Sequence, residues 1–124
     1  MLRVFIATVA LAVLTATAAV AQSNAPVYCG SYTCFQIHAN ALGKDADTRA
    51  NSAMDVINKY LGGAVGRVST KPEGKNVRLL LNGETVTVVT PADASAERQK
   101  SPAAVAQKWG SSLRAAFEQS KARK

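Results

Sequence analysis

Two cysteines and a single histidine lie close together early in this 124-residue sequence, and they are its best candidates for redox or metal chemistry. Cys29, Cys34 and His38 follow one another with C-x4-C-x3-H spacing. Thiolate and imidazole groups exchange disulfides or bind zinc and copper. A thioredoxin-type site has a C-x-x-C motif ahead of a helix, whereas this spacing is longer and an extended segment follows it. A closed zinc site needs a fourth ligand, for which Asp45 or Asp47 would have to supply an oxygen.

The first 21 residues have the three parts of a secretory signal peptide. Arg3 gives a basic start, an apolar run extends over residues 4–14, and an Ala-Val-Ala sequence ends at Ala21. The apolar run is short for a membrane span. We expect cleavage after Ala21, a periplasmic or secreted mature chain at residues 22–124, and no transmembrane segment after cleavage.

Export changes how the cysteines are interpreted, because an even number of cysteines in an oxidising compartment favours a disulfide. We expect a structural disulfide between Cys29 and Cys34, which stabilises a short loop by about 2 kcal/mol. The alternative is a periplasmic thiol-redox or metal-handling protein that uses Cys29, Cys34 and His38.

Other catalytic constellations are missing from the sequence. One histidine leaves little scope for a Ser-His-Asp relay, and the sequence has no H-E-x-x-H motif and no P-loop. Asp93 is the carboxylate of most interest because it follows a predicted strand, although a helix N-cap is the simpler interpretation. We therefore expect no enzymatic activity and no cofactor.

The sequence is basic, with a formal net charge of +7. Such a charge suits anionic polymers, lipid headgroups or nucleic acid, but the basic residues are scattered and lack interleaved aromatic side chains. We expect an envelope protein or an anionic envelope component as partner, and no specific nucleic acid. The candidate binding surface is Arg67, Lys71, Lys75 and Arg78. A solubilising charge is the simpler explanation, and an antimicrobial or toxin-like role is a further alternative.

The elements that must position these residues begin with a strand, predicted at residues 27–39 by its aromatic and β-branched side chains. A helix follows, with Asp45 or Asp47 as N-cap and Gly62-Gly63 as its end. Its apolar stripe, which leaves Arg49 outside, is Ala50, Ala53, Met54, Ile57 and Leu61. Residues 64–70 predict a short strand, and residues 71–74 predict a turn.

The strongest local signal is Asn82-Gly83, the preferred pair for a type I′ hairpin turn. It joins strands at residues 76–81 and 84–90. The turn predicts three cross-strand pairs, Leu81–Glu84, Leu79–Val86 and Val77–Val88, so that one face of the hairpin is apolar.

A second helix begins at Ser101-Pro102, and its Trp109 and Phe117 are large enough to cover the apolar face of the hairpin. The element order is β-α-β-β-β-α. We expect one α+β domain over residues 22–124: a two-layer sandwich with two helices on one face of a small, mainly antiparallel sheet. Residues 22–26 form a leader and residues 120–124 a basic tail, and both are expected to be flexible.

Five short segments occur in an order that is known from a protein family: Phe35-Gln36-Ile37, Thr48-Arg49-Ala50, Leu81-Asn82-Gly83-Glu84, residues 88–94, and a helix through Trp109 and Leu113. Over residues 35–117 the sequence resembles the small extracytoplasmic domain that precedes the membrane part of some bacterial mechanosensitive-channel-type proteins. Thr48 stands where that pattern has an acidic residue, and the cysteine pair lies outside the pattern. The resemblance implies an accessory or interaction module and assigns no catalytic residue. The sequence therefore predicts an exported, non-enzymatic binding domain of the cell envelope.

Overall fold

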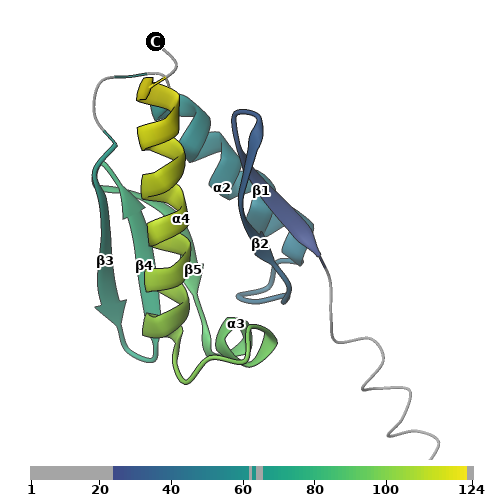
Figure 1. The fold of residues 1–124 in the computed structure, drawn as a ribbon. Coiled ribbons are helices and arrows are strands. Elements are labelled where there is room, and N and C mark those ends of the chain that lie inside the picture. Colours follow the sequence, from purple (N-terminus) through teal and green to yellow (C-terminus); the bar gives the residue numbers. More distant parts are fainter. Residues whose placement is uncertain (1–23, 62, 64–65, 123–124) are drawn as a thin grey trace, which may run out of the picture.

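The computed structural model describes residues 24–61, 63 and 66–122, and the predicted signal peptide lies outside this part of the chain. The elements in chain order are β1 (Ala25–Cys29), β2 (Tyr32–Ile37), α2 (Ala46–Tyr60), β3 (Val68–Glu73), β4 (Asn76–Leu81), β5 (Glu84–Val89), α3 (Pro91–Ala96) and α4 (Pro102–Ala122). They form an α+β fold, as predicted, with a two-stranded and a three-stranded antiparallel sheet (Figure 1).

The three-stranded sheet has the order β3-β4-β5, and α4 runs across one of its faces (Figure 1). Along β4, buried Leu79 and Leu81 alternate with the half-exposed Arg78 and Leu80, as expected for a strand with one covered face. Trp109 of α4 is 1% exposed. The β4 residues of the predicted apolar face therefore pack on α4. Val88, which the sequence pattern places on the same face, lies on the other face, because it pairs with Arg78.

The β4–β5 hairpin contains a β-bulge, which the alternation of side chains in the sequence does not predict. Asn82 and Gly83 have φ angles of 54° and 86°, as a type I′ turn requires, and Leu81 pairs with Glu84 as predicted. The next pair keeps this register, and the register shifts between Leu80 and Leu79. The observed pairs are Leu80–Thr85, Leu79–Thr87, Arg78–Val88 and Val77–Val89. The predicted pairs Leu79–Val86 and Val77–Val88 are wrong, because Val86 is the extra residue of the bulge.

The segment predicted as one strand, residues 27–39, is a second hairpin with its turn at Gly30 and Ser31. Its β1 strand includes Ala25 and Pro26, the last residues of the predicted leader. A bulge leaves Cys34 unpaired beside Phe35, whose ring stacks on Trp109 with the centroids 4.7 Å apart. This stacking anchors the hairpin to α4.

Each of the two long helices contacts both sheets. α4 contacts β2 and all three strands of the larger sheet, whereas α2 packs against β1 and β5. The predicted N-cap Asp45 is confirmed, since its carboxylate accepts a hydrogen bond from the Thr48 backbone N–H at 2.8 Å. The observed element order, β-β-α-β-β-β-α-α, adds one strand and one short helix to the prediction.

The edge strand β3 begins at Val68, and residues 64–65 of the predicted strand lie outside the described residues. The strand continues through Lys71 and Pro72 to Glu73, where a turn was expected. The turn is formed instead by Gly74, with a φ of 61°, and Lys75. Lysine and proline are typical of exposed edges, because both discourage pairing with another chain.

Candidate functional site

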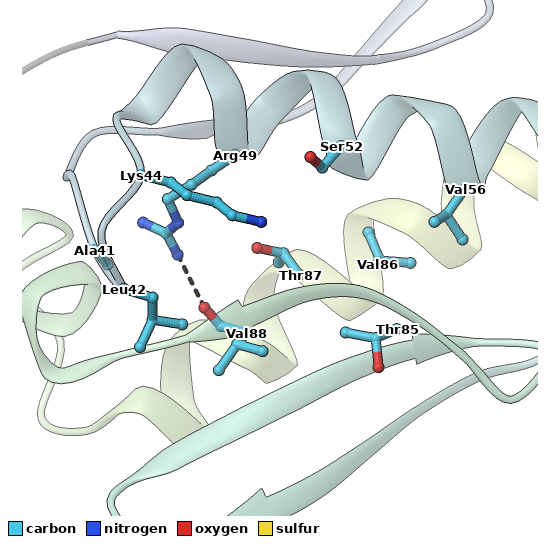
Figure 2. Close-up of a pocket in the computed structure, with 10 residues that line it drawn as sticks. All are labelled: Ala41, Leu42, Lys44, Arg49, Ser52, Val56, Thr85, Val86, Thr87 and Val88. Atoms are coloured by element: carbon cyan, nitrogen blue, oxygen red, sulfur yellow. Dashed lines mark hydrogen bonds between the residues drawn. The ribbon is translucent and has the colours of Figure 1, made fainter.

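A cleft of about 260 Å³ lies between the middle of α2 and strand β5, and we call it the α2–β5 cleft. The loop at residues 41–44 closes one end of it (Figure 2). The lining residues are Ala41, Leu42 and Lys44 from the loop, Arg49, Ser52 and Val56 from α2, and Thr85, Val86, Thr87 and Val88 from β5. The bulged residue Val86 therefore belongs to the cleft, and bulges are common beside functional sites.

The cleft exists because α2 is tied to β5 by polar contacts near both of its ends. In the first turns of the helix, Arg49 donates a hydrogen bond to the Val88 carbonyl at 2.9 Å. In the last turn, Lys59 and Tyr60 both donate hydrogen bonds to Glu84. Between these two ties the helix presents the small Ser52 and the half-exposed Val56 to the strand, and the space is left open.

The contact of Arg49 with β5, which we call the inner tie, belongs to a buried ion pair. Arg49 and Asp93 are 5% and 1% exposed, and the guanidinium binds both carboxylate oxygens, at 2.8 and 2.7 Å. The remaining partners are the backbone carbonyls of Ala39, at 2.8 Å, and Val88. The prediction that Arg49 lies outside the buried face of its helix is wrong. Its charge is accommodated in the interior because the fork geometry of the guanidinium is fully matched.

Asp93 has a structural role in this arrangement. It is the third residue of α3, whose N-cap is Thr90. Its carboxylate accepts from the Thr90 backbone N–H at 2.8 Å, while the Thr90 hydroxyl accepts from the Asp93 N–H. The prediction that Asp93 is the N-cap is therefore wrong. Thr90 is the N-cap, and Asp93 is the N3 residue of the same capping box. The sequence Thr90-Pro91-Ala92-Asp93 carries this signal, with proline at the first helical position.

The contacts of Lys59 and Tyr60 with Glu84, which we call the outer tie, are partly exposed to solvent and shift the pKa values of all three groups. The hydrogen bond from Lys59, followed by the one from Tyr60, holds the pKa of Glu84 below its ordinary value. The hydrogen bond to Glu84 raises the pKa of Lys59 and the pKa of Tyr60. The tie is therefore strongest where Glu84 is ionised and both of its partners are protonated.

The mouth of the cleft carries an unusual residue. Leu42 and Gly43 have φ angles of 57° and 76°, and Ala41 and Lys44 exchange backbone hydrogen bonds at 2.9 and 3.0 Å across this tight turn. Left-handed backbone suits glycine or asparagine and costs about 1 kcal/mol for other residues. Leu42 also exposes 61% of its surface. Neither property was predicted from the sequence pattern.

The Lys44 end of the cleft carries most of its polar groups, beside the apolar Leu42 and Val88 (Figure 2). In Figure 2 the Lys44 ammonium and the Thr87 hydroxyl point into the same space, and the Ser52 side chain extends from α2 above it. Val56 and Val86 lie further along, away from the loop (Figure 2). Among the residues that the structure describes, the Lys44 ammonium has neither a hydrogen-bond nor an ion-pair partner.

The structure joins Cys29 and Cys34 in a disulfide, with their Cα atoms 5.8 Å apart, and both residues are buried. His38 follows the end of β2, where its Nδ1 lies 2.7 Å from Asn24 Oδ1 and its Nε2 lies 3.4 Å from Glu97 Oε2. Within the described ranges, no three histidine, cysteine, aspartate or glutamate side chains form a group able to hold a metal ion. The sequence motif Cys29–Cys34–His38 is thus divided between the disulfide of the hairpin and a half-buried histidine beside Glu97.

The four basic residues of the candidate surface are brought together only in part. Lys71 and Arg78 face each other across β3 and β4, and Lys75 lies in the turn that joins these strands. Arg67 precedes the opposite end of β3, where its backbone N–H binds the Asn82 side chain. Arg78 is paired with Glu73 and also donates to the Thr85 hydroxyl.

A comparison with protein-family models places the sequence of this chain in a family. Residues 26–120 match the model of a domain of unknown function, DUF8459, so the chain belongs to that family. No curated protein and no solved structure matches the chain. The family match provides no link to mechanosensitive-channel-type proteins. Within the described residues, none of the helices has the length and apolar character of a membrane span.

Proposed function

We propose that this chain is an exported, non-enzymatic binding domain of the cell envelope, and that its ligand occupies the α2–β5 cleft. The observation that carries the proposal is Leu42 at the cleft mouth. Its backbone lies in a region that leucine avoids, and most of its apolar surface faces solvent. Strained residues cluster at functional sites, and a strained position that exposes an apolar side chain beside a cleft is suited to contact with a ligand.

The groups in the cleft suit binding better than catalysis. They are aliphatic side chains, hydroxyls and one unpaired ammonium, Lys44. The nearest interior carboxylate, Asp93, is fully engaged by Arg49 and Thr90. A concave site with a largely apolar lining and a few convergent polar groups is typical of small-ligand recognition.

Export is supported by two features. The first 21 residues have the pattern of a signal peptide, and the disulfide between Cys29 and Cys34 is of a kind that persists in oxidising compartments. The candidate partner classes are an envelope protein and an anionic envelope component. An accessory role beside a membrane protein is also compatible with the sequence resemblance.

The test is a titration of the ¹⁵N-labelled, disulfide-intact mature chain with a mixed library of small charged and neutral amphiphiles. We expect the amide shifts to concentrate at residues 41–44 and 85–88. Leu42→Asn should abolish or strongly weaken the binding. Tyr28→Thr is the matched control and should leave binding unchanged, because Tyr28 is also a large exposed side chain, at 47%, but lies outside the cleft lining.

Two results would contradict the proposal. One is that no compound of the library changes the amide chemical shifts of the cleft residues. The other is a set of shifts around Lys71 and Arg78 that disappears as salt is raised, which would assign the protein to anionic polymers.

A further inference from the structure

On the basis of the proposed function, we infer the ligand class of the α2–β5 cleft: a small monocarboxylate joined to a short apolar body. The charge of the cleft supports an anion. Arg49 contributes no net charge, because Asp93 neutralises it within the interior. Lys44 is the remaining cation of the lining, and its ammonium points into the cleft (Figure 2).

The polar end of the cleft supplies donors that suit a carboxylate. An ammonium has only donors, and a hydroxyl can donate to either side. Lys44 and the hydroxyls of Ser52 and Thr87 therefore offer three donor groups around one space. The neighbouring Asp45 carboxylate faces the α2 backbone instead, where the Thr48 N–H lowers its pKa.

The same geometry argues against a phosphate. Dianions of this kind are typically held by an arginine fork. Both terminal nitrogens of Arg49, the guanidinium in the lining, are already bound to Asp93 and to backbone carbonyls. One free ammonium with two hydroxyls matches a single negative charge better.

The size of the cleft limits the apolar body. A volume of about 260 Å³ corresponds to roughly nine molecules of liquid water, at about 30 Å³ each. The ligand therefore has on the order of ten non-hydrogen atoms inside the cleft. Val56 and Val86 receive its apolar part, and Leu42 contacts the ligand at the loop end of the cleft.

Two sources carry this chemistry: a free medium-chain fatty acid, and the C-terminal residue of a chain that ends in an aliphatic side chain. The probes for them are octanoate and N-acetyl-leucine. Each has a neutral twin, octan-1-ol and N-acetyl-leucine amide. All four are titrated against the ¹⁵N-labelled mature chain and against the variants Lys44→Gln and Lys75→Gln.

We expect the acids to shift the cleft amides with an affinity about tenfold higher than their neutral twins, since a charge-assisted hydrogen bond contributes about that factor. Lys44→Gln should lower the affinity of the acid to that of the neutral twin and leave the neutral twin unchanged. Lys75→Gln makes the same charge change in the β3–β4 turn and should have no effect. Preference for octanoate identifies the free acid as the source, and preference for N-acetyl-leucine identifies a chain terminus.

The inference fails if the neutral twins bind as well as the acids, or if Lys44→Gln leaves acid binding unchanged. It also fails if none of the four probes moves the cleft amides while another compound of the mixed library does, and in that case the proposed function stands. If neither set moves the cleft amides, the inference and the proposed function both fail.

Discussion

The β1–β2 hairpin and the α2–β5 cleft are held together by opposite means. The hairpin is closed by a covalent bond between two cysteines five positions apart in sequence, and stacking of Phe35 on Trp109 fixes it to α4. The cleft depends on polar contacts between distant residues, with Arg49 and Asp93 separated by 44 positions. The difference teaches that the most reactive residue types of a sequence can serve structure, while ordinary ones form the open site.

The largest expected effect comes from breaking the inner tie of the cleft. Asp93→Ala leaves the Arg49 charge buried without its carboxylate, which should lower the free energy of unfolding by about 3–5 kcal/mol. That is a large part of the stability of a domain of this size. Urea unfolding of the purified variant measures the loss.

The matched control for this variant is the double change Arg49→Met with Asp93→Ala. It removes the buried charge itself, so it should be more stable than Asp93→Ala alone. A single variant that loses less than about 1 kcal/mol, or a double variant that is no more stable than the single, would mean that the pair does not hold α2 against β5.

The second effect concerns the hairpin. Replacing both Cys29 and Cys34 with alanine should lower the free energy of unfolding by about 2 kcal/mol, as expected for a short closed loop. The amide resonances of residues 85–88 should stay unchanged, because the disulfide contributes no group to the cleft. A shift of these resonances would instead show that the hairpin and the cleft are structurally coupled.

A smaller effect of opposite sign is expected at the cleft mouth. Leu42→Asn places a residue that tolerates left-handed backbone at a φ of 57°, and should stabilise the fold by about 0.5–1 kcal/mol. Thermal unfolding measures the gain. Leu42→Ala is the control, since it removes the apolar contact but keeps the backbone strain. Destabilisation by Leu42→Asn would show that Leu42 contributes to packing, and that its backbone conformation is not a sign of a ligand-binding role.

The smallest effect is the pH dependence of the outer tie. Because the pKa of Glu84 is lowered in the folded state, its contribution to stability is fully present above the unfolded pKa and is lost as the pH falls through the folded value. In Lys59→Met this acid-induced loss should be reduced. Thermal unfolding between about pH 2.5 and 7, together with NMR titration of the Glu84 carboxyl, measures it, and identical acid limbs for the two proteins would exclude the contribution.

The predictable parts of the fold are those that neighbouring residues decide. Asn82-Gly83 specifies its turn through backbone preference, Asp45 caps α2 through a side chain three residues from its partner, and Ser101-Pro102 marks the start of α4. The Cys29–Cys34 pairing follows from the presence of two cysteines in a chain with export features. These signals established the α+β class and the positions of both long helices.

Two of the errors have a common physical origin. A bulge depends on which of two adjacent side chains packs better in the finished core, so alternation alone could not show that Val86 and Thr87 would both be buried. The first hairpin is a different case, because its turn residues Gly30 and Ser31 are a two-residue pair of the kind that joins hairpin strands, and the single strand predicted over residues 27–39 overlooks this signal. The burial of Arg49 could not be foreseen either, because an arginine enters the interior only where a distant carboxylate is already in place.

The sequence by itself determined the class of the fold, its turns and helix starts, and the covalent staple, because each depends on residues within a few positions of one another. The tertiary structure alone decided the α2–β5 cleft. Its walls come from two segments, residues 41–56 and 85–88, that are distant in the sequence. The open space lies between two sets of polar contacts, which form only when α2, β5 and α3 have packed together. A cavity is a property of how elements fit, and no single element specifies it.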